Sequence, residues 1–151
     1  RPKKVGRPEK IYRLTTKVDP MFPHLDNELN MEILEATDRI YGPNAAEKLL
    51  YSYFQSKGDR FMPKVKGDTV EERTTSLARL RSQEGHLSEC ETDSGGGLRM
   101  VEYHSPLTHL AKTYPTVSRM EQQMIERLIG AKVNRTQESA SGLVKYIFAV
   151  N

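Results

Sequence analysis

The residues that decide the fold are Leu98 to Gly130, which read LRMVEYHSPLTHLAKTYPTVSRMEQQMIERLIG. The stretch begins as a predicted β-strand, and this strand ends at the turn His104-Ser105-Pro106. A short helix is expected between this turn and Pro115, because proline cannot continue a helix. Beyond Pro115, apolar residues recur at helical spacing at Val117, Met120, Met124, Ile125 and Leu128. They predict a longer amphipathic helix that ends at Gly130.

Three further helices are predicted before this stretch. They cover residues 28–41, 45–62 and 69–83, where apolar residues keep helical spacing. Gly42-Pro43 separates the first helix from the second. Asp68, followed three residues later by Glu71, fits a capping box, so we expect Asp68 to cap the third helix.

Two β-hairpins are predicted, one on each side of the helix pair. The first joins residues 86–93 to residues 98–105 through a glycine-rich turn, and the second joins residues 132–139 to residues 143–150. The predicted order is therefore three helices, a hairpin, two helices and a hairpin. This order is typical of an α+β domain with an antiparallel sheet and segregated helices.

The composition excludes several classes of protein. A single cysteine, Cys90, cannot form a disulfide within the chain, and it excludes a multi-cysteine metal site. The sequence has no run of about 18 apolar residues, so we expect no helix that spans a membrane. Because no signal-peptide pattern appears, we expect a cytoplasmic protein.

Positive charge is concentrated at the start of the chain. Residues 1–17 contain seven lysines and arginines and one acidic residue, Glu9, whereas the whole chain has a net charge of +3. A basic segment on a nearly neutral body is typical of a protein that contacts a polyanion. Residues 11–15 alternate as a strand would, so we expect a basic loop that leads into a strand. The residues expected to contact DNA phosphates are Lys3, Lys4, Arg7, Lys10 and Arg13.

The same segment has three interpretations. The first is a solvated basic terminus without a partner. The second is an AT-hook, because Gly6-Arg7-Pro8 resembles the core of that minor-groove motif, although an AT-hook lies in a disordered tail. The third is a wing: GRP-x-x-x-Tyr-x-Leu-Thr is similar to the second wing strand of bacterial regulators of the ArsR/DeoR type. That resemblance implies contact with double-stranded DNA and a recognition helix that precedes Arg1.

Residues 98–150 carry a series of motifs that resemble a known effector domain. They are Tyr103-His104-Ser105-Pro106, Tyr114-Pro115, Ser118, Glu121, Leu128-Ile129-Gly130-Ala131-Lys132-Val133-Asn134-Arg135 and Tyr146. In this order they are similar to the effector domain of SufR-like winged-helix regulators, a bacterial group that includes iron–sulfur sensing repressors. The resemblance implies a homodimeric transcription regulator, in which residues 1–17 end the winged helix, 18–27 form a linker, and 28–151 form an effector-sensing and dimerisation domain.

The chain departs from this family at the iron ligands. The family has cysteines near the positions where this chain has Ser105, Ser118 and Val144. Thiolates bind iron in clusters because soft sulfur matches iron, and serine hydroxyls are poor substitutes. We therefore expect the family's framework without its cluster, with no metal and no cofactor.

The polar and aromatic residues around this framework are candidates for an effector site. They are Cys90, Tyr103, His104, Ser105, His109, Ser118 and Tyr146. One alternative is a sensor that binds a metal or small ligand through His104, His109 and Cys90. Another is that His104 is a turn residue, His109 lies on a helix surface, and Cys90 is a small buried hydrophobe. A third is an unidentified small-molecule effector in a pocket between the helices and the sheet.

A small hydrolase is the contrasting hypothesis. His104 next to Ser105 resembles a nucleophile beside its base. The sequence, however, has no G-x-S-x-G elbow, no P-loop and no G-x-G-x-x-G motif. We therefore expect a protein that is not an enzyme.

Overall fold

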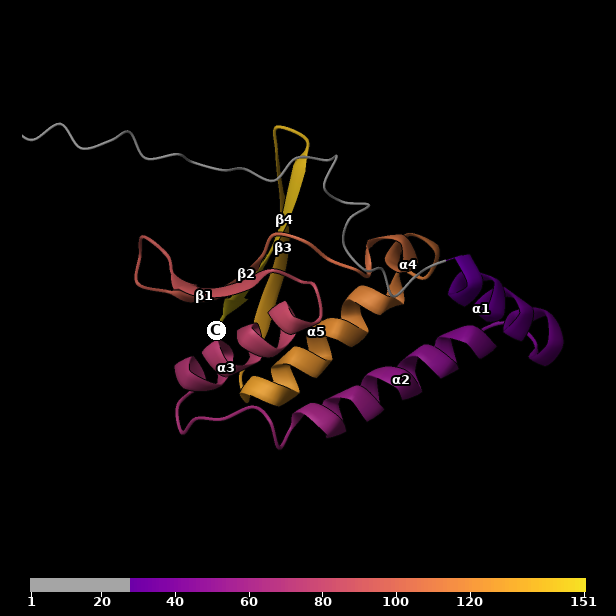
Figure 1. The fold of residues 1–151 in the computed structure, drawn as a ribbon, viewed down its shortest axis with the longest axis horizontal. Coiled ribbons are helices and arrows are strands. Elements are labelled where there is room, and N and C mark those ends of the chain that lie inside the picture. Colours follow the sequence, from indigo (N-terminus) through magenta and orange to yellow (C-terminus); the bar gives the residue numbers. More distant parts are fainter. Residues whose placement is uncertain (1–27) are drawn as a thin grey trace, which may run out of the picture.

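Residues 28–151 are described by a computed structural model, and they form five helices and a four-stranded antiparallel sheet (Figure 1). The elements are α1 (Glu28–Tyr41), α2 (Ala45–Phe61), α3 (Val70–Gln83), β1 (Ser88–Thr92), β2 (Leu98–Glu102), α4 (Thr108–Thr113), α5 (Thr116–Ile129), β3 (Val133–Ala140) and β4 (Leu143–Val150). The predicted α+β class is confirmed. The predicted wing, linker and DNA-contact residues lie outside the described residues. None of the helices in residues 28–151 has both the length and the apolar composition of a membrane span.

The two hairpins join into one sheet with the strand order β1-β2-β4-β3. β2 and β4 pair antiparallel, with Val101 opposite Ile147 and Glu102 opposite Tyr146. Local alternation predicts each hairpin, but it contains no signal for this pairing, which joins residues far apart in the sequence. The pairing brings the turn that follows β2 beside the middle of β4.

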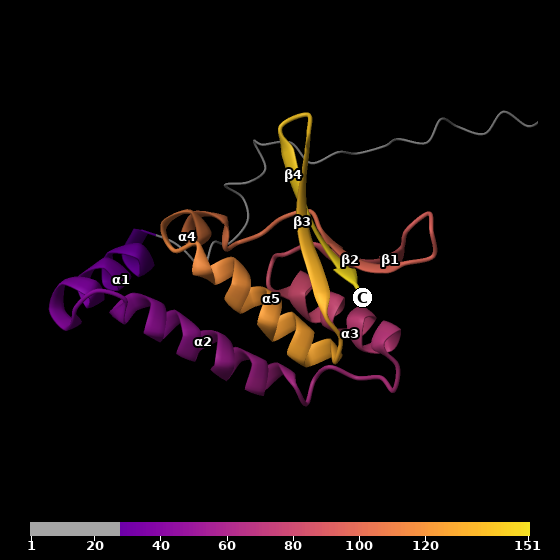
Figure 2. The ribbon, with the colours of Figure 1, turned by 180° about the vertical axis from the view of Figure 1, so that it is seen from behind.

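Helix α5 lies between α2 and the sheet in both views of the molecule (Figures 1 and 2). Its Val117 and Ile125 are almost completely buried, and they share one core with Phe54 of α2 and Phe148 of β4. Burial of each such side chain stabilises the fold by about 1.5–3 kcal/mol. Gly130 ends α5 with a φ of +74°, a left-handed conformation that favours glycine, as the sequence predicts.

The cap of α3 differs from the prediction by one residue. The helix begins at Val70, and the side chain of Thr69 accepts a hydrogen bond from the backbone N–H of Glu72. Glu72 accepts in return from the backbone N–H groups of Thr69 and Asp68, and these hydrogen bonds lower the pKa of Glu72. The predicted capping pair of Asp68 and Glu71 is wrong. Asp68–Glu71 and Thr69–Glu72 both have the spacing of a capping box, and only one of the two pairs can cap the helix.

Helix α1 is the one helix of residues 28–151 that contributes no buried residue. It packs mainly against α2. Several of its apolar side chains are exposed: Leu29, Ile33, Ile40 and Tyr41. The amphipathic face that the sequence predicts is therefore only partly covered within residues 28–151.

Candidate ligand-binding pocket

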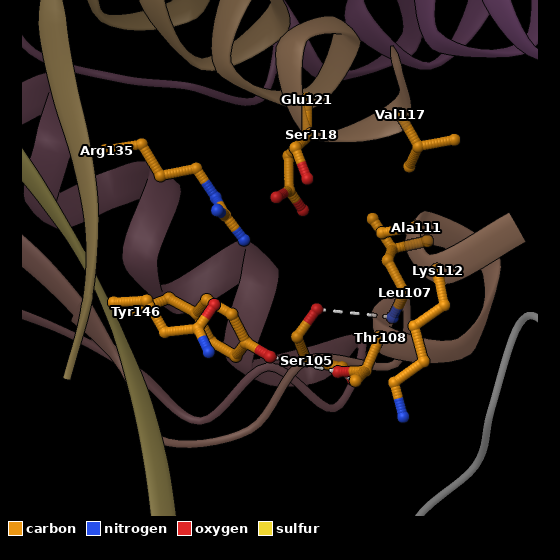
Figure 3. A pocket seen from close by; sticks show the side chains of 11 residues that line it. Ser105, Leu107, Thr108, Ala111, Lys112, Val117, Ser118, Glu121, Arg135 and Tyr146 are labelled. Atoms are coloured by element: carbon orange, nitrogen blue, oxygen red, sulfur yellow. Dashed lines mark hydrogen bonds between the residues drawn. The ribbon is translucent and has the colours of Figure 1, made fainter. Parts of the chain in front are cut away.

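A pocket of about 300 Å³ opens between the turn that follows β2, helices α4 and α5, and strands β3 and β4 (Figure 3). Most of the side chains that line it are polar. They are Ser105, Thr108, Lys112, Ser118, Glu121, Arg135, Gln137 and Tyr146, together with Leu107, Ala111 and Val117. The segments that meet here are far apart in the sequence, so the pocket depends on the β2–β4 pairing and on the packing of α5.

The turn that follows β2 forms one wall and is held by its own side chains. The backbone N–H of Leu107 donates to Ser105 Oγ at 3.2 Å, and Thr108 Oγ1 donates to the Ser105 carbonyl at 2.9 Å. Serine and threonine commonly fix the backbone in this way at the start of a helix. The hydroxyls of Thr108 and Tyr146 lie 3.2 Å apart, which connects the turn to β4 (Figure 3).

Arg135 of β3 forms a second wall. The guanidinium carbon lies over the aromatic ring of Tyr146, 4.9 Å from the ring centroid, and 6.0 Å from the centroid of Phe148. The Nε atom of Arg135 is buried and has no hydrogen-bond partner. Within residues 28–151, Arg135 also forms no ion pair. A guanidinium that lines a pocket without a carboxylate partner is an available donor for an anionic ligand.

Glu121 of α5 lines the pocket from another side and connects it to a buried group of charges. Its Oε2 accepts a hydrogen bond from Arg81 Nη2 at 2.7 Å. Arg81 is completely buried and donates to both oxygens of Glu102, at 2.5 and 2.7 Å. His86 Nδ1 lies 3.1 Å from Arg81 Nη2, and Ser88 Oγ donates to Glu102. We call these five residues the Arg81 cluster.

The charges in the Arg81 cluster stabilise one another. Burial by itself would raise the pKa of Glu102, because it disfavours the charged carboxylate. The charge and hydrogen bonds of Arg81, with a smaller contribution from His86, outweigh burial and hold the pKa of Glu102 well below its usual range. Burial likewise opposes the charge of Arg81, but Glu102 and Glu121 raise the pKa of Arg81 above its usual value. The cluster therefore keeps one guanidinium between two carboxylates.

The same cluster contains a set of side chains with metal-binding chemistry. Of the residues that the structure describes, only His86, Glu102 and Glu121 form a group of three whose ligand atoms are close enough to hold an ion, within 4.8 Å of one another. Arg81 already binds both carboxylates. Because its guanidinium supplies the positive charge that a metal would bring, we assign the cluster to internal ion pairing.

The structure brings together three of the seven predicted effector-site residues. Ser105, Ser118 and Tyr146 all line the pocket. The remaining four do not line it: Cys90, Tyr103, His104 and His109. Val144, near the position of the family's last cysteine, also lies outside the pocket lining.

The alternative site of His104, His109 and Cys90 is not assembled. Across residues 28–151, these three side chains do not come within ligand distance of one another. Cys90 is half-buried in β1, opposite Met100. His104 is buried, and its backbone N–H donates to the carbonyl of His86. His109 is exposed on α4, because the short helix turns that side chain away from the core.

Three charged residues of the site were not among those predicted. Thr74 and Leu77 face the core, and Arg81 follows them at helical spacing. The periodicity of this helix therefore already places a charged residue, Arg81, on the buried face. Glu121 and Arg135 stand within the motifs that carry the family resemblance. Nothing in a linear pattern indicates that they face one pocket, because they come from separate elements.

No model of a protein family matches this sequence, and no curated protein matches it. The resemblance to SufR-like regulators therefore stays a prediction, and the polar pocket is the main support for a function.

Proposed function

We propose that this protein is a DNA-binding transcription regulator in which residues 28–151 bind a small-molecule effector. The observation that supports it most is the pocket, where Ser105, Ser118 and Tyr146 meet. A ligand there would contact α4, α5, β3 and β4 at once. Its binding energy would therefore favour one arrangement of these elements, which is what an effector must do to change a second site.

The hydrogen bonds around the pocket favour binding over catalysis. Ser105 Oγ accepts from the backbone of Leu107, and Thr108 shares a hydrogen bond with Tyr146, so these hydroxyls stabilise the wall of the pocket. His104, the base in the hydrolase hypothesis, does not line the pocket. A nucleophile and its base must lie within hydrogen-bond reach of each other and of a substrate.

Contact with DNA is assigned to the basic residues 1–17. In the sequence, residues 18–27, the predicted linker, stand between this charge and the described domain. Lysine and arginine side chains that neutralise phosphates release counterions from DNA, which makes the affinity depend on salt. We propose the cytoplasm as the place of action, as for the bacterial regulators that residues 98–150 resemble.

We also propose that the protein acts as a homodimer. The support is the exposed apolar side of α1, which includes Leu29, Ile33, Ile40 and Tyr41. An apolar helix face that the rest of the domain leaves open is typical of a surface that a second subunit covers. A two-fold dimer would also give two basic segments for a palindromic operator.

The test of DNA contact uses Arg7→Ala in the full chain. We expect weaker binding to a fluorescent DNA duplex. The slope of log affinity against log salt concentration should also decrease in magnitude by about 1, because one phosphate contact is lost. Fluorescence anisotropy over a series of salt concentrations measures both. The matched control is Arg60→Ala, which removes an exposed arginine from the end of α2. Unchanged affinity and slope in Arg7→Ala would contradict the assignment of residues 1–17 to DNA.

A further inference from the structure

We propose that the pocket binds a small zwitterion, a molecule of the free amino-acid class that carries both a carboxylate and an ammonium group. The inference rests on the proposed effector function and names the chemistry of the effector. Two side chains carry it: Arg135, which offers a positive charge, and Glu121, which offers a negative one. Figure 3 shows both pointing into the same space from different walls.

Arg135 supplies the carboxylate-binding half. Its Nε atom is buried without a hydrogen-bond partner, and no carboxylate of residues 28–151 forms an ion pair with it. The guanidinium carbon lies over the ring of Tyr146, 4.9 Å from the ring centroid, and this contact helps to hold the guanidinium beside the pocket. A buried donor without a partner is costly, and a planar guanidinium suits the two oxygens of a carboxylate.

Glu121 supplies the ammonium-binding half. One of its oxygens, Oε2, accepts from Arg81, whereas no hydrogen bond to Oε1 is found among the described residues. Glu121 is only 3% exposed, and the hydrogen bond to Arg81 holds its carboxylate in place at the wall of the pocket. An ammonium group of a ligand can therefore bind to an acceptor that is already oriented, and it need not displace Arg81.

The two charges share the pocket without pairing with each other. No ion pair joins Arg135 to Glu121, although both line the same cavity. A ligand with a carboxylate alone would leave Glu121 Oε1 without a partner, because Arg81 binds only Oε2, and a ligand with an amine alone would leave Arg135 without an ion pair. A ligand that carries both groups satisfies both side chains and is therefore favoured over either half.

The size and lining of the cavity agree with this class of ligand. Ligand pockets begin at about 300 Å³, so this one has the volume that a small molecule needs. Ser118 on α5 adds a hydroxyl to the lining of the same pocket. This hydroxyl can both donate and accept, which suits a short polar side chain on the ligand.

The test measures binding to the full chain by isothermal titration calorimetry. The twenty standard L-amino acids are titrated one at a time. For each amino acid that binds, its two halves follow: for L-serine these are 3-hydroxypropionate, which lacks the amine, and ethanolamine, which lacks the carboxylate. We expect at least one amino acid to bind, and each of its halves to bind about ten-fold or more weakly, because one charged hydrogen bond is lost. Equal affinity for a half, or no binding of any amino acid, would overturn the proposal.

Variants of the pocket identify where the ligand binds. Arg135→Gln should weaken binding about ten-fold or more, and Arg135→Lys should weaken it less, because lysine keeps the charge but not the planar fork. The control is Arg119→Gln, an exposed arginine of α5 that does not line this pocket. Thermal unfolding checks that each variant is folded. If a folded Arg135→Gln protein binds the amino acid as tightly as the wild type does, the ligand does not bind at this pocket and the proposal is wrong.

Failure here is distinguishable from failure of the proposed function. If no amino acid binds but DNA binding depends on Arg7, the protein is a regulator with another effector. If an amino acid binds through Arg135 but Arg7→Ala leaves DNA binding unchanged, the site stands and the assignment of residues 1–17 to DNA does not.

Discussion

Arg81 and Arg135 lie against the same aromatic ring but have opposite surroundings. Each guanidinium carbon is 6.0 Å from the centroid of Phe148. Arg81 is completely buried and binds Glu102 and Glu121, whereas Arg135 has no ion pair within residues 28–151. Arginine therefore has two different roles in this domain. The paired arginine ties α3 to β2 and α5, and the unpaired one faces a pocket where a ligand can reach it.

The largest effect is expected when the paired arginine is removed. Arg81→Met leaves two carboxylates buried without their partner, so we expect the free energy of unfolding to fall by about 3–5 kcal/mol. Urea denaturation measures it. The control is Arg79→Met, which removes an exposed arginine from the same helix and should change stability little. If Arg81→Met lowers the free energy of unfolding no more than Arg79→Met does, the structural role assigned to the Arg81 cluster is wrong.

Acid should break the same cluster in the wild-type protein. The pKa of Glu102 is lower in the folded protein than in the unfolded chain, so its contribution to stability is complete above the unfolded pKa and is lost as the pH falls through the folded one. We therefore expect the free energy of unfolding to decline as the pH is lowered from about 5. Glu102→Gln should flatten this decline, although Glu72 and Glu126, whose pKa values are also lowered, leave a residual slope. Denaturation series at several pH values compare the two proteins, and identical profiles would contradict the pairing.

The smallest effect on stability is expected at the unpaired arginine. Arg135→Met removes a charge that no carboxylate of the described residues balances, and it keeps most of the apolar contact with Tyr146. We expect stability to change by less than about 1 kcal/mol, the size of a partly exposed cation–π contact. The same denaturation experiment measures it. If Arg135→Met lowers the free energy of unfolding as much as Arg81→Met does, Arg135 is a structural residue like Arg81.

Much of the fold follows from local sequence patterns. The helical spacing of apolar residues predicts α1, α2 and α5 closely, and the glycine-rich turn at 93–97 predicts the first hairpin. The cap of α3 was misplaced because Asp68 and Thr69 are adjacent acceptors, and their relative geometry decides between them. The pairing of β2 with β4 was not predicted, since strand order depends on contacts distant in sequence.

The site was predicted only in part, for a related reason. Ser105, Ser118 and Tyr146 were found through the family resemblance, and they do share the pocket. Arg135 and Glu121 were not recognised as site residues. The chemistry of a charged side chain depends on whether a partner lies beside it, and that partner comes from another element. Periodicity indicates which residues are buried, but it does not indicate which buried charges are paired.

The β2–β4 pairing has a consequence for how the pocket forms during folding. It joins strands on either side of α4 and α5, so closing it orders a long loop and costs more entropy than closing either hairpin. The pocket walls are therefore complete only when the whole domain is folded. A molecule that binds there binds the native state and not the unfolded chain, so by mass action it should raise the melting temperature of the entire domain as its concentration rises.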